Sequence, residues 1–157
     1  VGLDIGCWFE GLCTDMAVTA GIGKISREAE HLIRATREAL EIGIRAVRPG
    51  ARVGDIGAAV GAHLGKNNLG IIRDLAGHGV GYRVHEEPLI PNYGREGTGA
   101  ELKEGMVIAI EPMVTAGSFE LVHSPDGHGF ETKDKSLSAH FEHTVLVTED
   151  GYEVLIK

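Results

Sequence analysis

The sequence predicts an α+β domain with a largely antiparallel sheet and flanking helices. A strand–turn–strand pattern opens the chain, two stretches of helical periodicity follow, and the remainder consists of short strand-like runs and loops. The chain has 157 residues, of which 43% are hydrophobic and 24% are charged. This length suits a single domain over residues 1–157, and the composition argues against a disordered chain or a coiled coil.

The first predicted element is a β-hairpin whose turn is Glu10-Gly11. Its two strands are Leu3–Glu10 and Leu12–Thr19. A two-residue turn there places Asp15 opposite Gly6, so Asp4 and Asp15 become diagonal neighbours on one face, within about 7–8 Å. Two carboxylates so placed repel each other, which favours either a cation between them or a face open to solvent.

Two helices are predicted after the hairpin. Ser26 is a suitable N-cap for the first helix, which runs to about Val47 and ends before Pro49-Gly50. The second runs from about Asp55 to Lys66, although its internal glycines oppose helix formation. The rest of the chain is predicted to form strands at Ile71–Leu75, Met106–Met113, Phe119–Val122, His143–Thr148 and Tyr152–Ile156, with a loop from Pro88 to Gly105.

Charge and cysteine content exclude several classes of protein. The chain has 15 Lys+Arg and 23 Asp+Glu, a formal net charge of −8, which argues against binding to nucleic acid. No apolar run approaches the roughly 20 residues that cross a bilayer. The chain begins within a strand at Val1 without signal-peptide features, which favours a piece of a longer protein. Cys7 and Cys13 fall on opposite faces of the hairpin, so we expect reduced thiols, as suits the cytoplasm.

A histidine between glycines is the next candidate for chemistry. His78 lies in AGHGVGYRVHEEP, residues 76–88, and His85 follows it in the same segment. The glycines allow positive φ angles and the close approach of another group. The pattern indicates a ligand with a second proton-handling group nearby, and a structural histidine is the alternative. The segment is not a phosphate-binding loop, because the P-loop lysine and the following helix are missing.

Two carboxylates interrupt apolar segments further along the chain. Glu111 ends the apolar run of GMVIAIEPM, residues 105–113, and Glu142 stands between Phe141 and the run HTVLVT. Burial of a carboxylate in such a segment is costly unless it is paired or binds a metal ion. For each residue taken alone, a solvated surface position is the favoured explanation.

These candidates form a chemically consistent set: Asp4, Asp15, His78, Glu111 and Glu142. Four carboxylates and one imidazole suit a pair of divalent first-row ions, whereas structural zinc sites are rich in cysteine. Two ions roughly 3.5–4 Å apart can share a hydroxide and polarise a carbonyl. The implied reaction class is hydrolysis.

The order of these residues resembles that of the methionine aminopeptidases, which have the pita-bread fold. The resemblance is carried by Asp4, Asp15, GHGVG, HEEP, IEPM and SAHFEHT, and it extends from Asp4 to the C-terminus. No long insertion separates His78 from Glu142, as is typical of the type I enzymes. The resemblance therefore implies a pita-bread α+β fold for this chain.

The resemblance also implies a role for each site residue. The five metal ligands are Asp4, Asp15, His78, Glu111 and Glu142. Asp15 and Glu142 bridge the two ions, and Glu111 additionally takes the proton of the attacking water. His85 contacts the substrate amide and helps to stabilise the tetrahedral intermediate. The resemblance further implies that hydroxide held between the ions attacks the scissile carbonyl, which releases the initiator methionine from peptides with a small second residue.

The family resemblance implies two divalent metal ions, which are cobalt, manganese, iron or zinc. It implies peptide N-termini as partners, with the ribosome as a family-level partner, and a monomeric, cytoplasmic enzyme. Val84, His128 and Met113 match positions that border the methionine pocket. Family members often carry an aromatic residue at the first position and tryptophan at the second, so we expect looser selection of the first residue here.

The family also has a segment upstream of the first ligand, with a further active-site histidine and part of the pocket. We therefore expect residues 1–157 to be a single catalytic domain without its N-terminal segment, and a poor enzyme by itself. Two other readings stay open: a proline-directed aminopeptidase P or prolidase, and an inactive pita-bread module that binds proteins. The FEHT and EPM motifs favour the methionine enzyme, and inactive modules typically lose ligands that this chain retains.

Overall fold

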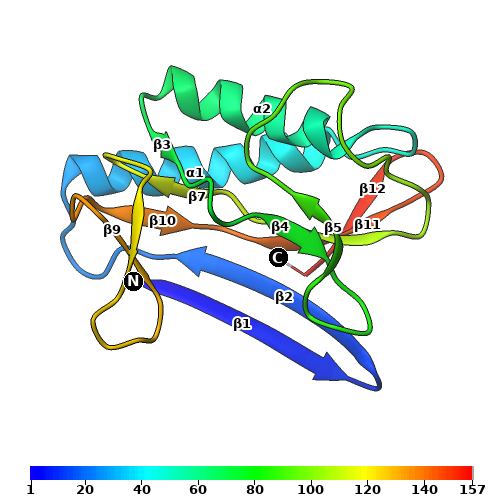
Figure 1. The fold of residues 1–157 in the computed structure, drawn as a ribbon, viewed down its shortest axis with the longest axis horizontal. Coiled ribbons are helices and arrows are strands. Elements are labelled where there is room, and N and C mark those ends of the chain that lie inside the picture. The colour runs from blue at the N-terminus through cyan, green and yellow to red at the C-terminus, as the bar shows by residue number, and fades with distance from the viewer. Residues whose placement is uncertain (157) are drawn as a thin grey trace.

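Two helices cover the strands from one side, and the N-terminal hairpin borders the strands on the side away from the helices (Figure 1). The computed structural model describes residues 1–156. The helices are α1, Arg27–Arg45, and α2, Val53–Lys66, which pack against each other. The strands are β1 (Gly2–Phe9), β2 (Leu12–Thr19), β3 (Gly70–Ile71), β4 (Gly77–Gly79), β5 (Glu86–Ile90), β6 (Val107–Ile110), β7 (Met113–Thr115), β8 (Leu121–His123), β9 (Phe130–Thr132), β10 (Ser138–His140), β11 (His143–Val147) and β12 (Tyr152–Ile156).

Every strand pairing in residues 1–156 is antiparallel, which confirms the predicted sheet type. The largest sheet has the order β12-β11-β6-β4-β5, and a second has the order β10-β7-β3. β1-β2 and β8-β9 form separate hairpins. A backbone bridge between Ala17 and Glu142 attaches the first hairpin to the segment between β10 and β11.

The hairpin has the predicted register. Glu10 and Gly11 both have positive φ, 49° and 86°, as a two-residue turn that follows the twist of the strands requires. Asp15 consequently lies opposite Gly6, and Asp4 lies on the same face two residues along β1. Cys7 and Cys13 are both free, as the opposite-face placement predicts.

Both helices begin and end close to their predicted bounds. The Ser26 side chain accepts a hydrogen bond from the Ala29 N–H at 3.1 Å and caps α1. The glycines of α2 serve packing, because a Cβ at Gly54 or Gly57 would collide with backbone carbonyls of the segment 91–98. The loop thus lies directly on the helix, which offsets the low helix propensity of glycine.

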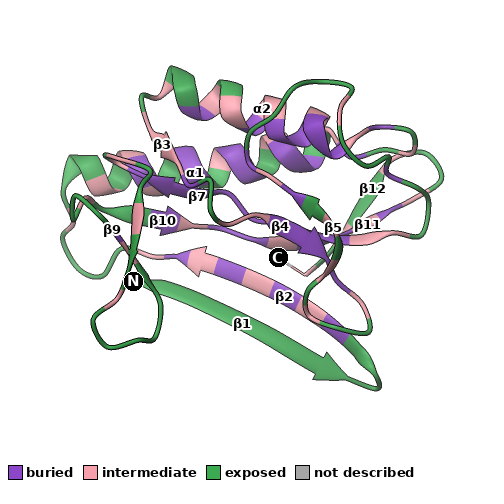
Figure 2. Cartoon of the chain, viewed as in Figure 1, coloured by how far each residue is buried: buried purple, intermediate pink, exposed green. Residues whose placement is uncertain are grey.

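The core lies between the helices and the two larger sheets (Figure 2). Its largest fully buried apolar side chains are Leu32, Leu40, Ile56, Leu64, Ile90, Leu102, Ile108 and Ile110. β2 alternates between buried and partly exposed residues, whereas every residue of β1 is exposed. Within residues 1–156, no helix is long and apolar enough to cross a membrane.

Several predicted strands are wrong in extent. The prediction of one strand at Met106–Met113 fails because the chain changes partners at Glu111-Pro112: β6 pairs with β4 and β11, whereas β7 pairs with β3 and β10. Ile71–Leu75 contracts to Gly70–Ile71, since the partner strand β7 is itself short. Phe119–Val122 moves to Leu121–His123.

Four strands were not predicted: β4, β5, β9 and β10. β4 has only three residues, two of which are glycine, so the sequence shows no strand pattern there. β5 occupies the start of the predicted Pro88–Gly105 loop, and it tolerates Pro88 because it lies at the edge of its sheet. β9 and β10 are too short and too polar for a periodic pattern to show, and they form through pairing with β8 and β7.

Candidate metal centre

The structure brings all five predicted ligands together from separate elements. Asp4 and Asp15 come from β1 and β2, His78 from β4, and Glu111 and Glu142 from the segments that follow β6 and β10. Asp15, His78, Glu111 and Glu142 are buried, whereas the Asp4 side chain is 63% exposed. The folding of the whole chain is therefore needed to assemble the cluster.

Threonine side chains hold β2 against residues 140–144. The Thr144 hydroxyl accepts a hydrogen bond from the Asp15 N–H at 3.0 Å and donates one to the Asp15 carbonyl at 2.7 Å. At the other end of β2, the Thr19 hydroxyl makes the same two contacts with the His140 backbone, both at 2.9 Å. Between them lies the backbone bridge from Ala17 to Glu142. These contacts fix the backbones that carry Asp15 and Glu142 beside each other.

His78 faces two carboxylates. Its Nε2 lies 3.3 Å from Glu111 Oε1 and 4.0 Å from Glu142 Oε1. Its Nδ1 lies 3.0 Å from the Gly79 carbonyl, and since a carbonyl can only accept, Nδ1 donates and Nε2 is directed to the carboxylates. The prediction that the flanking Gly77 and Gly79 have positive φ angles is wrong. The predicted close approach of another group is confirmed, because a Cβ at either glycine would meet a backbone carbonyl of a neighbouring strand.

The electrostatics show an excess of negative charge at the cluster. Burial, together with Glu111, Asp15 and Asp4, raises the pKa of Glu142 to about 9. Burial and the nearby Asp4 also raise the pKa of Asp15. Burial acts to raise the pKa of Glu111 too, but the neighbouring His140 and His78 outweigh it and hold that pKa below its usual value. Burial acts to lower the pKa of His78, but its contacts with Glu111, the Gly79 carbonyl and Asp15 together raise that pKa above its usual value.

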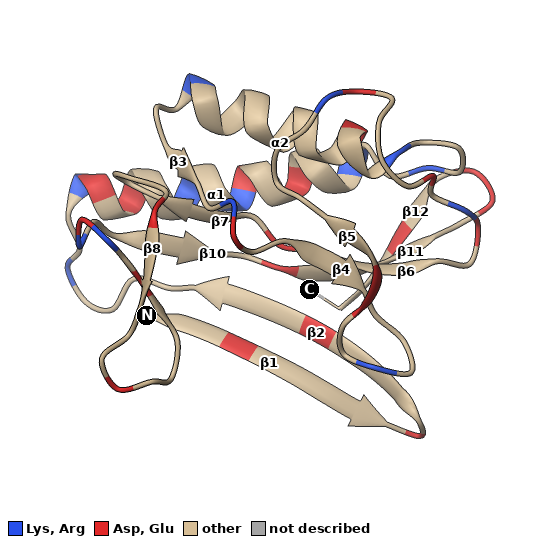
Figure 3. Cartoon of the chain, viewed as in Figure 1, with Lys and Arg blue, Asp and Glu red and all other residues tan. Residues whose placement is uncertain are grey.

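No lysine or arginine on the strands balances these acids within residues 1–156. None of the strands in residues 1–156 contains lysine or arginine, and the basic residues lie on helices and loops (Figure 3). Glu142 Oε1 is buried without a hydrogen-bond partner in the described structure. A buried oxygen without a partner is costly unless a cation completes its surroundings.

The donor atoms are close enough together to hold ions. Three groups each have ligand atoms within 4.8 Å of one another: Asp4, Asp15 and Glu142; His78, Glu111 and Glu142; and Asp15, His78 and His85. Glu142 belongs to both of the groups that consist only of predicted ligands, as a bridging ligand would, whereas Asp15 and His78 each belong to one of these groups and to the group with His85. The residues present therefore fit a pair of divalent ions with mainly oxygen donors.

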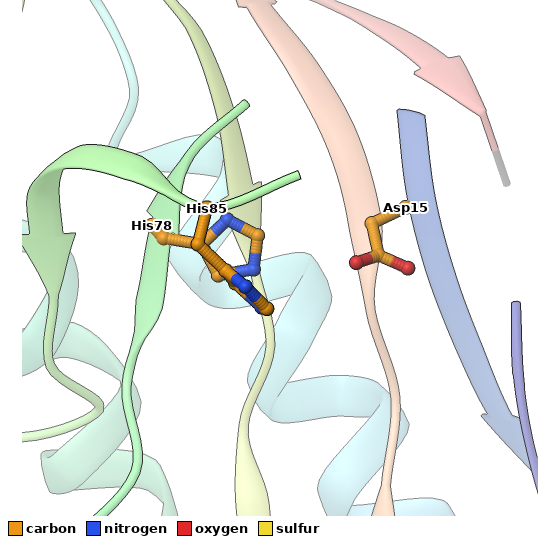
Figure 4. A group of neighbouring side chains, drawn as sticks. All are labelled: Asp15, His78 and His85. Carbon is orange, nitrogen blue, oxygen red and sulfur yellow. The ribbon is translucent and has the colours of Figure 1, made fainter. Parts of the chain in front are cut away.

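His85 lies against His78. The two ring centroids are 4.3 Å apart with the ring planes at 76°, and Asp15 reaches from β2 toward both imidazoles (Figure 4). His85 lies between β4 and β5 and is exposed, so it can contact a ligand that enters from solvent.

A cavity of about 520 Å³ opens on the cluster. Its lining includes Asp4, His85, Glu111 and Met113, and its apolar wall includes Leu121 and Phe130 from the β8–β9 hairpin. Val84 and His128, which were also predicted to bind substrate, lie outside this lining. Their roles remain predictions.

Sequence reasoning missed three residues of the centre. His140 contacts Glu111, and Thr19 and Thr144 bind the backbone of the opposite segment. His140 stands two residues before Glu142 in an extended segment, which is a usable signal, since alternate residues share a face. Nothing in the sequence indicates the threonine contacts, because they depend on how distant segments pair.

Comparison with known proteins defines the family. The profile of "Metallopeptidase family M24" matches residues 1–149. This chain belongs to that family. The family consists of metallopeptidases, and the cluster of carboxylates and histidine contains groups that could hold a metal ion.

Individual relatives of this M24 chain are consistent with the family assignment. Methionine aminopeptidase B of Synechocystis is 44% identical over 155 residues, covering 99% of this chain and 57% of the relative. The crystal structure of methionine aminopeptidase from Thermotoga maritima matches with a TM-score of 0.97 and 45% identity, covering 99% of this chain and 63% of that one. Prolidase from Pyrococcus furiosus matches with a TM-score of 0.76 and 25% identity, covering 99% and 40%. The pita-bread fold is thereby confirmed, and the chain spans about three-fifths of the length of the methionine aminopeptidases it matches.

Proposed function

We propose that residues 1–157 form a metallopeptidase catalytic domain that binds two divalent ions. We further propose that the protein, at its full natural length, removes N-terminal methionine from peptides with a small second residue. The observation that carries this proposal is that Glu142 belongs to two neighbouring groups of donor atoms beside an open cavity, one with Asp4 and Asp15 and the other with His78 and Glu111. The identity of 44–45% to methionine aminopeptidases, against 25% to a prolidase, supports the substrate class.

In this proposal Asp4, Asp15, His78, Glu111 and Glu142 hold the ions, which are cobalt, manganese, iron or zinc. When bound, such ions lower the pKa of water and polarise the carbonyl of the peptide bond. The charge that they supply compensates the buried carboxylates, so the raised pKa of Glu142 falls on binding.

Glu111 and His85 carry the remaining steps. Glu111 lines the cavity and its pKa is held low, so it is ionised and accepts the proton of the attacking water before passing it to the departing amine. His85 lines the same cavity and donates a hydrogen bond to the oxygen that gains negative charge. The free thiols of Cys7 and Cys13 support a reducing compartment such as the cytoplasm.

The roles of His85 and of the ligands are separable by substitution. His85→Ala should retain its ions while kcat falls by about 10²–10³, the usual cost of losing one donor to the developing oxyanion. Loss of ions from this variant would instead make His85 a ligand, in the group it forms with Asp15 and His78.

The proposed substrate class is tested by comparing two tripeptides on the Mn²⁺-loaded protein at its full natural length. Met-Ala-Ser should be cleaved far faster than Ala-Pro-Ala. Preferential cleavage of Ala-Pro-Ala would assign the protein to the proline-directed relatives. Absence of cleavage of both by ion-loaded protein would favour a binding module.

A further inference from the structure

We propose that His140 is a positioning residue that orients the Glu111 carboxylate. This inference rests on the proposed function, because it concerns how Glu111 is presented to the ions and to the substrate. His140 lies at the end of β10, outside the set of residues that resembles the family ligands. It adds a role for a residue that neither holds an ion nor contacts the reacting atoms.

The two oxygens of Glu111 face different imidazoles. Oε1 lies 3.3 Å from His78 Nε2, on the side of Glu142, and Oε2 lies 3.1 Å from His140 Nε2. An imidazole nitrogen at ion-pair distance from one carboxylate oxygen favours one orientation of the carboxylate plane, so the other oxygen points in a single direction. His140 thus leaves Oε1 for the ion that His78 and Glu142 would share.

The position of the His140 ring is itself fixed by the fold. Its backbone N–H and carbonyl are both bound by the Thr19 hydroxyl at 2.9 Å, which prevents the end of β10 from shifting. On the opposite edge of the ring, Nδ1 lies 3.8 Å from Asp4 Oδ2. The imidazole therefore stands between the carboxylates of two neighbouring ion-sized groups and restrains the inner, buried one.

The cavity raises one competing role. His140 is part of the cavity lining, so it could contact the substrate directly. A substrate contact and a positioning contact differ in what they change: the former affects KM, whereas the latter affects ion affinity and kcat.

The experiment compares His140→Leu, which removes both ring nitrogens, with His140→Gln, which keeps an N–H donor. His31→Leu is the matched control, since His31 lies on α1, where its ring contacts Asn67 and Arg34 and is outside the cluster. Mn²⁺ binding is measured by calorimetry, kcat and KM are measured on Met-Ala-Ser, and thermal unfolding is measured without metal.

His140→Leu should weaken Mn²⁺ binding by about 10–100-fold and lower kcat at saturating Mn²⁺ by at least about 10-fold, with KM within about 2-fold of wild type. His140→Gln should recover most of both losses, and His31→Leu should match wild type. An increase in KM alone would assign His140 to substrate binding and overturn the proposal. Unchanged Mn²⁺ affinity, or equal losses in the Leu and Gln variants with a matching fall in metal-free unfolding temperature, would also overturn it. All variants are made in the protein at its full natural length. If that wild-type protein fails to cleave Met-Ala-Ser, the proposed function fails, while the comparison of Mn²⁺ binding still decides the role of His140.

Discussion

β1 and β2 belong to one hairpin and each supplies an aspartate to the same cluster, yet they meet very different surroundings. The Asp4 side chain on β1 is 63% exposed, whereas Asp15 on β2 is 8% exposed. β2 is bound along its length by Thr19, Ala17 and Asp15 to the segment 140–144, and β1 pairs only with β2 in the described structure. We therefore expect Asp15 to be the stronger ligand and Asp4 the weaker one, because of what packs beside each strand.

This difference has an electrostatic consequence. Removal of water strengthens the attraction between a carboxylate and a cation, and it also raises the cost of leaving that carboxylate without one. Burial and the nearby Asp4 raise the pKa of Asp15, so the ionised form of this carboxylate is unfavourable without a cation. The buried side of the cluster, Asp15 with Glu142, should therefore dominate ion affinity.

The largest expected effect comes from the residue shared by the two carboxylate groups. Glu142→Gln keeps the shape of the side chain but removes a charge beside β2, so cleavage of Met-Ala-Ser should fall by at least about 10³-fold. Glu131→Gln is the control and should stay close to wild type, because Glu131 is a partly exposed glutamate of the β8–β9 hairpin that pairs with Lys135 and lies outside the cluster. Wild-type turnover in Glu142→Gln would remove this residue from the centre.

The next comparison sets the two strands directly against each other. Asp15→Asn should lower Mn²⁺ affinity at least about 10-fold more than Asp4→Asn, because solvent screens the exposed carboxylate. The measurement is calorimetric titration of each metal-free variant. Equal losses would show that burial does not decide ligand strength at this site.

The threonine contact should account for part of the stability of β2. Thr144→Val preserves shape but leaves the Asp15 N–H and carbonyl without their partner, and should reduce the free energy of unfolding by about 1–3 kcal/mol. Thr144→Ser keeps the hydroxyl and should lose less. Denaturant unfolding of the metal-free proteins measures both, and a Ser variant as unstable as the Val variant would indicate that the methyl group matters instead.

The last prediction concerns the pH dependence of stability. The pKa of Glu142 is about 9 in the folded chain, above the usual value near 4.3, so between these values the unfolded chain has released a proton that the folded chain retains. Rising pH therefore favours unfolding of the metal-free protein, by at most about 1.4 kcal/mol per pH unit from this group. Thermal unfolding in chelator from pH 5 to 9 should show the decline, and Glu142→Gln should flatten it. Parallel profiles for the two proteins would contradict the raised pKa.

The sequence predicts the features of the fold that depend on local geometry, and it does not predict those that depend on the pairing of distant segments. A two-residue turn fixes the pairing of the hairpin, so the shared face of Asp4 and Asp15 followed from local geometry. Both helices follow from periodicity and the Ser26 cap. The break at Glu111-Pro112 was missed because it depends on a change of partner strands, which no local pattern encodes.

The site shows the same division. Glu111 and Glu142 stand out as carboxylates in apolar segments, and the structure buries both. The difference between Asp4 and Asp15 could not be predicted, because it arises from the pairing of β2 with residues more than a hundred positions away. The position of His140 two residues before Glu142 was a usable signal, but its distance of 3.1 Å to Glu111 could not be predicted, because it depends on how distant segments pack.

The proposed centre requires two ions that are bound side by side by the buried carboxylates. Titration of the metal-free protein with Mn²⁺, followed by calorimetry, should give two ions bound per wild-type chain and should show both lost in Glu142→Gln. One ion per chain, or two ions in both proteins with equal affinity, would contradict a shared centre built on Glu142.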